Sequence, residues 1–484
     1  MTSETERRPD TEAGRGHTSL PRRLGLLSAI AVLVGSTIGT GIFRTPAGIA
    51  TKVPVESLYL LLWGLGGFFS LCGALTLAEL SAALPQTGGI FVYLREGWGR
   101  LAAFLFGWGE LVVIRASALG AISTVFAEYF LRLFGQSTTV TLNTAGGVVT
   151  QSAPGVHYVA AGAILVVAVI NILGIRLGAY IQNLTAGVKY LALLLLVLAA
   201  FALGAQHPPP VVVPATETAT SPSIAMFGLA FISLLWVYDG WADVTFVSGE
   251  VQRPERFLPR TLIIGTLAVI AIYLLANFAY LHLLGINEIA HSKLVAADVA
   301  YRIIGDAGVR LISIAVMISA FGTLNGSMMT GPRIFFAMAD DGLFFRRIAA
   351  VHPRFKTPYV AIGLAAALAI AFVLVRTFEQ LSDTFVLGIW PFYALGVAAV
   401  YRLRRKRPDL PRSYKTLGYP VTPALFILAV LLLVGNALVG DIRYYLAIWA
   451  GGPNPHEWSG ALMVAGIILA GIPAYYLWTR NSKQ

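Results

Sequence analysis

The chain is a series of long apolar segments separated by short polar stretches. The apolar segments lie near 25–50, 57–83, 101–133, 157–175, 184–204, 223–248, 261–284, 309–336, 358–376, 382–402, 420–439 and 457–478. Because a membrane-spanning helix needs about 20 predominantly apolar residues, the pattern predicts an all-α polytopic membrane protein with about twelve transmembrane helices.

The first apolar segment is interrupted at 35–43, which reads Gly-Ser-Thr-Ile-Gly-Thr-Gly-Ile-Phe. Gly39 and Gly41 flank Thr40, and glycines this close weaken a helix. In hydrocarbon, such a break is tolerated only where it faces protein or a water-filled cavity. Opened here, the chain would present the N–H groups of Thr40, Gly41 and Ile42 at the positive end of a half-helix, which suits a carboxylate. The alternative is that the glycines only allow close helix packing.

The sixth apolar segment is interrupted in a similar way. Its stretch 236–241 (Trp-Val-Tyr-Asp-Gly-Trp) places Asp239 beside Gly240 in mid-membrane. The preceding stretch 205–222, rich in Pro, Thr and Ala, is typical of an extended external linker between two groups of five segments. Two interrupted helices at corresponding positions of two halves indicate a transporter site at the bilayer midplane.

Composition agrees with this class of protein. The chain is 57% hydrophobic and only 12% charged, with a mean hydropathy of +0.73, which excludes a soluble domain of this length. The net charge of +11 therefore concerns membrane orientation rather than nucleic acid. Residues 1–23 are polar and basic without an apolar core, which is typical of a cytosolic tail and not of a signal peptide.

The distribution of basic residues predicts the orientation. Arginine and lysine precede the first segment and follow the second, sixth, eighth and tenth, most densely at 402–415. The loops 135–156 and 205–222 contain neither residue. By the positive-inside rule, we expect a multi-pass protein of the plasma (inner) membrane with both termini cytoplasmic.

Short stretches along the chain resemble one family of transporters. They are 35–43, Ala78-Glu79-Leu80, Pro85-Gln86-Thr87-Gly88-Gly89, 110–115 (Glu-Leu-Val-Val-Ile-Arg), 250–260, Asn325-Gly326-Ser327 and Arg333-Ile334-Phe335-Phe336. Taken in order, they resemble the amino acid–polyamine–organocation superfamily, and within it the L-type amino acid transporter branch.

This resemblance implies a five-plus-five inverted repeat typified by the bacterial leucine transporter, with broken first and sixth helices and two additional C-terminal helices. It implies secondary active transport of L-amino acids by alternating access, as sodium-independent exchange or proton-linked uptake. The implied parts are a cytoplasmic tail (1–24), a first five-helix repeat (25–204), an external linker (205–222), a second repeat (223–402), a basic cytoplasmic loop (403–419), two additional helices (420–478) and a cytoplasmic tail (479–484).

The resemblance also implies a substrate site at the two breaks, formed by Thr37, Ile38, Gly39, Thr40, Gly41, Trp236, Val237, Asp239 and Gly240. The amides of Thr40 and Gly41 would hold the α-carboxylate. The α-ammonium would bind to the carbonyl groups of Thr37, Trp236, Val237 and Asp239. The chemistry agrees, since half-helix N-termini attract anions and carbonyl ends attract cations. Trp236 falls where the family has an aromatic gate; the alternatives are packing for Trp236 and a helix cap for Asp239.

Lys189 is the most distinctive ionisable residue, near the predicted cytoplasmic start of the fifth segment. In the resembling branch, a lysine here occupies the position where sodium-coupled relatives bind their ion, which implies contacts with Ser319, Thr323 and Asn325. A charge there costs roughly 2.5–3.5 kcal/mol on insertion scales unless it is paired. Burial favours the neutral amine, so proton exchange is also open. The alternative is a side chain that extends to the membrane interface.

Five other charged residues have open roles. Glu79 and Arg333, at cytoplasmic helix ends, are candidates to pair with each other as an inner gate, or to act as interface anchors. Glu110 and Arg115 are expected to form a buried ion pair or a helix-stabilising contact. Arg44, just past the first break, is a candidate to influence the charge of the substrate.

Three other functions are alternatives to amino acid transport: a carrier of organic cations, a channel and a membrane-embedded enzyme. A carrier of polyamines or other organic cations stays possible, whereas a channel would need a continuous polar pore and an enzyme would need convergent polar groups. The expected partners are a small amino acid substrate and membrane lipid, without nucleic acid. The loop 135–156 has no cysteine, so no disulfide-linked ancillary subunit is expected. No metal or cofactor is expected, because the histidines show no ligand spacing and no Walker A or HExxH sequence is present.

Overall fold

The computed structural model describes residues 21–144, 147–208, 223–292, 294–450 and 460–481. The helices up to residue 203 are α1 (Leu26–Thr37), α2 (Gly41–Lys52), α3 (Glu56–Ala83), α4 (Ile90–Trp98), α5 (Arg100–Gly109), α6 (Arg115–Leu133), α7 (Pro154–Leu173) and α8 (Ile175–Leu203). The later helices are α9 (Ile224–Tyr238), α10 (Asp243–Phe246), α11 (Pro254–His291), α12 (Val295–Thr330), α13 (Pro332–Asp340), α14 (Tyr359–Val373), α15 (Phe378–Lys406), α16 (Val421–Trp449), α17 (Ala461–Leu469) and α18 (Gly471–Asn481). The remaining elements are the π-helical turn η1 (Glu110–Ile114), the 3-10 turns η2 (Ser248–Glu250) and η3 (Arg346–Ala349), and the strands β1 (Thr139–Thr144) and β2 (Gly147–Ser152).

Ten helical stretches among the described residues are long and apolar enough to cross a membrane. They are Leu26–Lys52, Glu56–Ala83, Arg100–Leu133, Pro154–Leu173, Ile175–Leu203, Pro254–His291, Val295–Asp340, Phe378–Lys406, Val421–Trp449 and Ala461–Arg480. Two further apolar helices, Met226–Tyr238 and Tyr359–Val373, are shorter. The prediction of a helical, multi-pass membrane protein is therefore confirmed.

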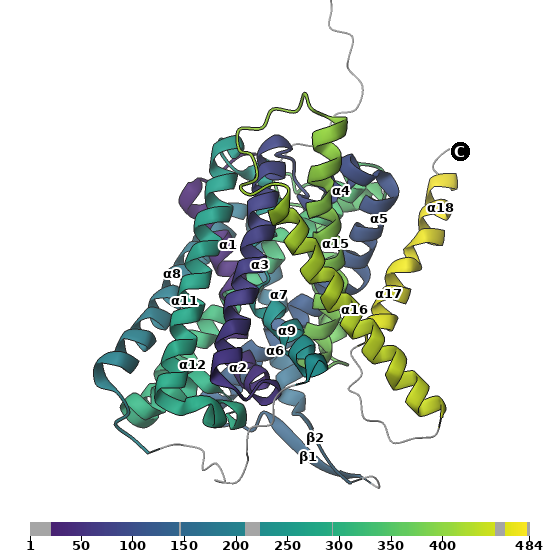
Figure 1. The fold of residues 1–484 in the computed structure, drawn as a ribbon. Coiled ribbons are helices and arrows are strands. Elements are labelled where there is room, and N and C mark those ends of the chain that lie inside the picture. Colours follow the sequence, from purple (N-terminus) through teal and green to yellow (C-terminus); the bar gives the residue numbers. More distant parts are fainter. Residues whose placement is uncertain (1–20, 145–146, 209–222, 293, 451–459, 482–484) are drawn as a thin grey trace, which may run out of the picture.

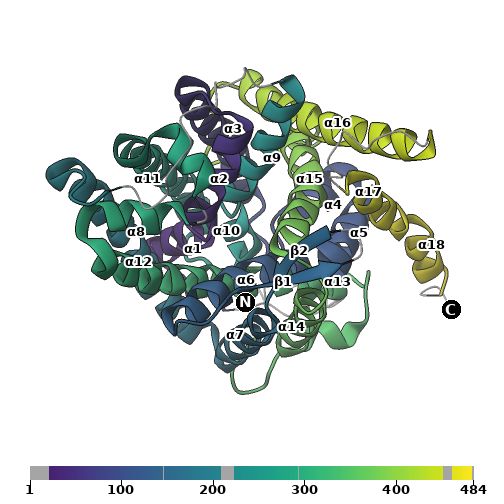
Figure 2. The ribbon, with the colours of Figure 1, turned by 90° about the horizontal axis from the view of Figure 1, so that it is seen from below.

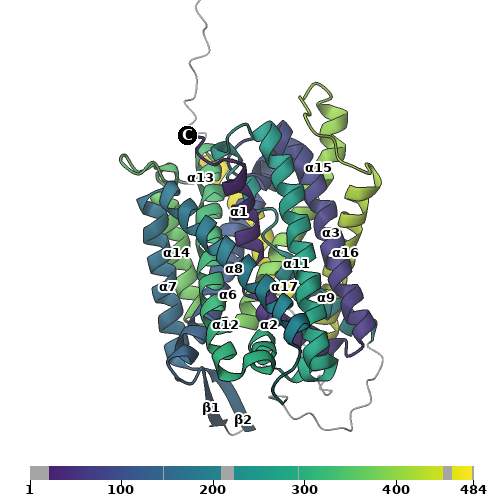
Figure 3. The same cartoon turned by 90° about the vertical axis from the view of Figure 1, so that its left-hand side faces the viewer.

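The loop predicted at 135–156 contains an antiparallel hairpin of β1 and β2, with Thr139 opposite Ser152 and Thr144 opposite Gly147. Its strands are rich in threonine and valine, whose branched side chains favour strands. The search for long apolar segments missed the hairpin because each strand has only six residues. The hairpin projects from one end of the helical bundle, called the hairpin end below (Figure 1, Figure 3).

The fifth predicted segment starts earlier than the apolar pattern indicated. α8 begins at Ile175, not near 184. Its first turns carry polar side chains that face other helices: Gln182 is fully buried, and its side-chain oxygen accepts a hydrogen bond of 3.1 Å from Asn325. Low hydropathy over these turns concealed the start of the helix, and Lys189 consequently lies in the middle of α8 rather than at its beginning.

The broken helices occupy the centre of the bundle. α1 packs against α8, α11 and α12, and α2 packs against α9 and α11. The short α10 contacts α1, so the second break lies against the first. α16 packs on α3 and α15, and α16, α17 and α18 lie along one side of the bundle (Figure 2). This arrangement places both breaks in the interior, away from lipid.

Candidate functional site

The interruption predicted in the first segment is present in the structure. α1 ends at Thr37 and α2 begins at Gly41, with non-helical backbone at 38–40. The first N–H groups of α2 have no acceptor within their own helix, so they are available to a ligand. A Cβ atom on Gly41 would lie 2.9 Å from Cα of Val237, which explains why glycine stands where the two broken helices meet.

The second break separates α9 from α10. α9 ends at Tyr238, and residues 239–242 form a turn before Asp243. Gly240 has a φ of 102°, which L side chains rarely adopt, and a Cβ atom there would lie 2.7 Å from the carbonyl carbon of Ser36. The main chains of the two breaks therefore touch, with no room for a side chain between them.

Tyr273 of α11, which sequence reasoning missed, joins the two breaks. Its hydroxyl lies 2.7 Å from the carbonyl oxygen of Thr37 and 3.2 Å from that of Val237. The carboxyl ends of α1 and α9 are thus held side by side. No local sequence signal marks this tyrosine, because its role depends on how α11 packs.

Asp239 occupies the position just after α9. Its backbone N–H donates to the carbonyl oxygen of Trp236 at 3.3 Å, so the main chain makes the cap that was considered for this residue. The side-chain atom Oδ1 is buried and has no hydrogen-bond partner in the described part of the chain. A buried acceptor without a donor is costly, which makes this oxygen a candidate to receive a ligand donor.

A cavity of about 40 Å³ lies between the two breaks. Of the predicted substrate-site residues, all except Ile38 line it: Thr37, Gly39, Thr40, Gly41, Trp236, Val237, Asp239 and Gly240. Sequence reasoning did not place the others at the cavity: Ser36, Arg115, Ala118, Ile122, Asp243, Thr323, Ser327 and Phe385. Most of these come from α6, α12 and α15, where neither an interruption nor an unusual spacing marks them.

A buried ionic cluster borders the cavity. Nε of Arg115 lies 3.0 Å from a carboxylate oxygen of Glu110, as predicted, and its Nη1 donates to the hydroxyl of Ser327 at 2.9 Å. Asp243 accepts a hydrogen bond of 3.1 Å from Thr330. Pairing and hydrogen bonds are what allow charges to remain inside a protein, so this cluster gives one wall of the cavity a fixed polarity.

Lys189 is fully buried, and its ammonium bridges α1 and α12. Nζ donates to the carbonyl oxygens of Gly35 at 2.7 Å and Ile38 at 2.6 Å, and to the hydroxyl of Thr323 at 2.9 Å. All three protons of the ammonium are therefore used. Ser319 is adjacent, donating weakly to the carbonyl of Ile38 at 3.4 Å. The interpretation of Lys189 as an interface anchor is wrong, because its side chain is 0% exposed.

Asn325, suggested as a further contact of Lys189, instead joins α12 to α8 and α7. Its Nδ2 donates to the carbonyl oxygen of Gly178 at 2.9 Å and to Gln182, and its Oδ1 accepts from Asn171 at 2.9 Å. These amide contacts hold α12 in place beside the ammonium without touching it.

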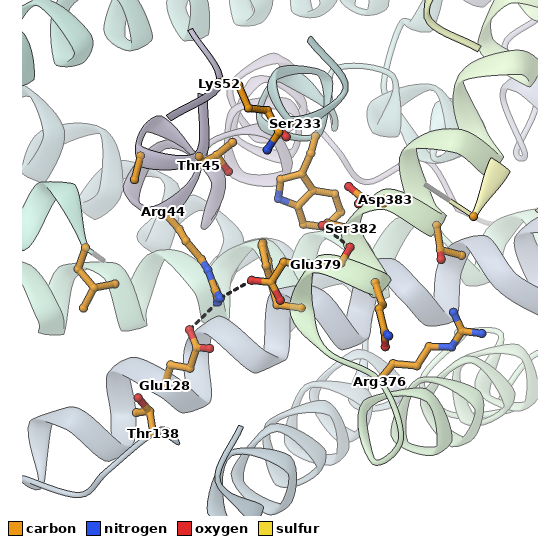
Figure 4. A pocket seen from close by; sticks show the side chains of 18 of the residues that line it. Arg44, Thr45, Lys52, Glu128, Thr138, Ser233, Arg376, Glu379, Ser382 and Asp383 are labelled. Carbon is orange, nitrogen blue, oxygen red and sulfur yellow. Dashed lines mark hydrogen bonds and ion pairs between the residues drawn. The ribbon is translucent and has the colours of Figure 1, made fainter. Parts of the chain in front are cut away.

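Trp236 stands between the small cavity and a larger pocket of about 820 Å³, since its side chain lines both. The ring meets Phe378 and Phe385 edge-on, with centroids 6.0 and 5.3 Å away. Thr138, the residue before β1, also lines the larger pocket, which therefore lies at the hairpin end (Figure 4).

Ion pairs cross between elements at the opposite end of the bundle. The predicted pairing of Glu79 with Arg333 is wrong: Arg333 binds Glu250 at 3.0 Å, and Glu79 binds Arg404 at 2.6 Å and Arg412 at 3.2 Å. Several arginines lie in the last turn of α15 and in the loop after it, and sequence alone could not say which of them contact Glu79. These ion pairs connect helix ends on the side of the small cavity that is opposite the larger pocket.

The fold and site define a multi-pass membrane protein with a small polar cavity between two broken helices, an arrangement typical of transporters. The chain belongs to the amino acid permease family, whose model matches residues 24–472. This membership confirms the superfamily inferred from the sequence and makes the protein an amino acid transporter rather than an enzyme.

Its relatives include exchangers and transporters of amino acids. The chain is 32% identical to the serine/threonine exchanger SteT of Bacillus subtilis (strain 168) over 462 residues, which cover 94% of this chain and 97% of that protein. It is 30% identical to the human b(0,+)-type amino acid transporter 1 over 398 residues, covering 82% of this chain and 79% of that one. Identity to the human cystine/glutamate transporter is 29% over 471 residues, or 97% and 88% of the two chains.

Proposed function

We propose that this protein exchanges small neutral L-amino acids across the membrane by alternating access, without sodium. The observation that carries the proposal is the cavity enclosed by the start of α2 on one side and the ends of α1 and α9 on the other. A zwitterion matches this arrangement, because helix N-termini attract anions and carbonyl ends attract cations.

The backbone supplies both halves of the proposed recognition. The N–H groups of Thr40 and Gly41, at the start of α2, bind the α-carboxylate. The α-ammonium lies toward the ends of α1 and α9, where the carbonyls of Thr37 and Val237 already accept from Tyr273. Each carbonyl oxygen has a second lone pair, and the unpartnered Oδ1 of Asp239 adds a further acceptor.

The size of the cavity supports a small substrate side chain. The cavity of about 40 Å³ is small, so a substrate with a short side chain needs the least widening of the site. Away from the two breaks, the apolar part of the wall is formed by Ala118, Ile122 and Phe385, and the polar part includes Thr323 and Ser327, which together suit a short or weakly polar side chain. SteT, a relative of this chain, is a serine/threonine exchanger, which also favours a small neutral substrate.

Counterflow in proteoliposomes tests this proposal. We expect serine, threonine and alanine to exchange, and phenylalanine and tryptophan to do so at least roughly tenfold more slowly, since pocket fit discriminates by factors of about 10–200. Rates should not change when sodium is replaced by an organic cation. Exchange of putrescine but of no amino acid would instead support a polyamine carrier, and flux without saturation or counterflow would support a channel.

The aromatic residue between the two cavities is proposed as a lid. Trp236→Ala removes its edge-on contacts with Phe378 and Phe385, each worth about 0.5–1.5 kcal/mol. Because closure commits the substrate, turnover is expected to fall by about tenfold while equilibrium binding changes less. Scintillation proximity binding and counterflow on the same preparation separate the two effects. Trp449→Ala, at an 89% exposed tryptophan of α16, is the control; unchanged kinetics in Trp236→Ala would leave only packing.

The proposal also includes the membrane arrangement. Ten long apolar helices and two shorter ones match the twelve predicted segments in order, and support the five-plus-five organisation with two additional helices. The basic residues at 402–415 lie at the end opposite the hairpin, which supports cytoplasmic termini and an external hairpin. Cys72 is 4% exposed and free, which supports transport without a disulfide-linked subunit.

A further inference from the structure

Asp243, the first residue of α10, is an acid in the wall of the small cavity without a counter-ion. Its side chain is 4% exposed, and it lines the cavity together with Asp239. It hydrogen bonds to the hydroxyl of Thr330 at 3.1 Å, and it forms no ion pair with the residues that the structure describes. An ionised carboxylate inside a membrane is costly unless it is paired, so its charge must be balanced in another way.

The arginine in the same wall is already matched by another acid. Among the described residues that line the small cavity, Arg115 carries the only positive charge. Its Nε and Nη2 lie 3.0 and 3.4 Å from the two carboxylate oxygens of Glu110, and its Nη1 donates to Ser327. Arg115 also attracts Asp243 electrostatically, without direct contact. One guanidinium therefore faces three acids, and its ion pair is with Glu110.

The other basic residues near the two breaks have partners of their own. The ammonium of Lys189 donates all three protons to oxygens of α1 and α12. Arg44, whose role the sequence left open, lines the larger pocket, where it pairs with Glu128 and Glu379 at 2.6 and 2.8 Å (Figure 4). Neither side chain is available to Asp243.

The elements packed against α10, which are α1, α11, α12 and η2, supply no further cation. α1 has no charged residue, those at the near end of α11 (255–260) are exposed, and those of α12 lie in its first half, at 298–310. Glu250 of η2 pairs with Arg333 at 3.0 Å. The phenol of Tyr393, from α15, interacts with both acids of the cavity but brings no positive charge.

A neutral substrate balances only one of the two acids. In the proposed function, the α-ammonium lies at the ends of α1 and α9, beside the unpartnered Oδ1 of Asp239. The α-carboxylate is held by the start of α2, and a neutral side chain brings no further charge. Asp243 therefore still lacks a counter-ion when the cavity is occupied. A buried acid in this situation becomes neutral by taking up a proton.

Two hydroxyl groups can stabilise the protonated form of Asp243. Thr330 has one hydroxyl proton, and its oxygen lies 3.0 Å from the carbonyl oxygen of Gly326. When Thr330 donates to that carbonyl, its own oxygen can accept from the protonated carboxyl. Ser36 is 7% exposed and lines the same cavity beside Asp243, and its hydroxyl makes no hydrogen bond of normal geometry with the described residues. It is therefore a second acceptor.

We propose that Asp243 binds a proton and that the protonated form is the one that carries a neutral amino acid across the membrane. The proposal rests on the proposed function. The carboxylate takes the proton from water on the side to which the cavity is open, forming an O–H bond, and returns it to water when the cavity opens again. An ionised Asp243 would have to stay in contact with water, whereas the neutral acid lets α1 and α12 close around the substrate.

The dependence of serine counterflow on pH tests this proposal, with equal pH on both sides of the proteoliposome membrane. Below the pH at which serine loses its own ammonium proton, the parent rate is expected to fall as pH rises, by up to about tenfold per pH unit, as for one essential acid. Asp243→Asn is neutral at every pH, so its rate should not change over this range.

The two rate profiles are therefore expected to cross. At acidic pH, Asp243→Asn should be slower than the parent by about threefold, because an amide reproduces the hydrogen bonds of the acid imperfectly. At alkaline pH it should be faster than the parent, a result that misfolding cannot produce. Asp306→Asn, at an exposed acid of α12, makes the same substitution outside the cavity and should retain the parental profile.

Infrared difference spectroscopy, recorded without substrate between acidic and alkaline pH, detects the proton itself. The parent protein is expected to show a carboxylic acid C=O band that Asp243→Asn loses and Asp239→Asn retains. The amine of Lys189 has no C=O group and cannot contribute to this band. The spectrum of the parent thus remains informative even if a variant fails to fold.

Four results would overturn the proposal. They are a parent spectrum without such a band, a band that only Asp239→Asn removes, a rate profile of Asp243→Asn as steep as that of the parent, and a monodisperse Asp243→Asn protein that is inactive at every pH. The last result would show that the ionised form is required.

The spectra do not depend on the identity of the substrate. If no small neutral amino acid is exchanged but the band of Asp243 is present, the proposed substrate class is wrong and the proton site stands. If exchange is normal and independent of pH, and the band is absent, the proton site is wrong and the proposed function stands.

Discussion

Replacing Gly41 with valine is expected to lower transport by at least about a hundredfold while the protein remains folded. A Cβ atom at this position would lie 2.9 Å from Cα and 3.1 Å from Cβ of Val237, and the valine methyl groups would add to the overlap. Because backbone atoms cannot rotate away, α2 must shift from α9, and the N–H groups proposed to bind the carboxylate move with it. Loss of a single donor from an oxyanion hole costs about 10²–10³ in rate, and a shift of α2 displaces more than one donor.

Counterflow and substrate binding measure this effect, with monodispersity in detergent as the test of folding. Gly48→Val is the matched control, because Gly48 lies in the same helix and a Cβ atom there meets nothing within 4 Å. Both variants make the same exchange of glycine for valine within one helix, so the change in helix propensity is matched. Transport by Gly41→Val close to that of Gly48→Val would contradict a substrate site at the first break.

Removal of the Lys189 ammonium is expected to have an effect of similar size. Lys189→Ala leaves the carbonyls of Gly35 and Ile38 and the hydroxyl of Thr323 without their shared donor, and so separates α1 from α12. A hydrogen bond to a charged group contributes about 1.5–3 kcal/mol, and the ammonium donates three of them, so a loss of more than a hundredfold in exchange rate is expected. Lys189→Arg should not restore the rate fully, since a planar guanidinium is larger than an ammonium and the site is fully enclosed.

Uptake by the three proteins across pH, in sodium and in an organic-cation salt, measures this prediction. Lys406→Ala, at an exposed lysine near the end of α15, controls for the loss of a positive charge. A parent rate that depends on pH, combined with an alanine variant that does not, would assign proton exchange to Lys189. Sodium-dependent transport by the parent protein, or normal transport by Lys189→Ala, would exclude the proposed substitution of an ammonium for sodium.

The two breaks were predictable because their causes are local. Gly39 and Gly41 on either side of Thr40, and Gly240 after an acid in mid-membrane, mark places where the helix cannot continue without a partner. The remaining wall of the cavity was not predictable. Ala118 and Phe385 are ordinary apolar residues within long helices, and only the packing of α6 and α15 brings them to the site.

The positions of polar residues along the chain were also predictable, whereas their contacts were not, as two cases show. Gln182 lowered the hydropathy of α8 and hid its first turns, although its partner Asn325 makes it an interior residue. Glu79 and Arg333 were correctly placed at helix ends, but the partners of Glu79 come from the end of α15 and the loop after it, and the partner of Arg333 from the turn after α10. Local patterns predict where a charge lies along a helix, whereas the choice of its partner depends on the connections between helices.

The contacts of Lys189 also have a consequence for how the chain assembles during synthesis. The two carbonyl acceptors, on Gly35 and Ile38, are made about 150 residues before Lys189, whereas Thr323 is made 134 residues after it. An unpaired lysine costs roughly 2.5–3.5 kcal/mol when its helix enters the bilayer. We therefore expect α1 to lie beside α8 as α8 enters the bilayer. The carbonyl groups of Gly35 and Ile38 would then accept hydrogen bonds from the ammonium before α12 is synthesised.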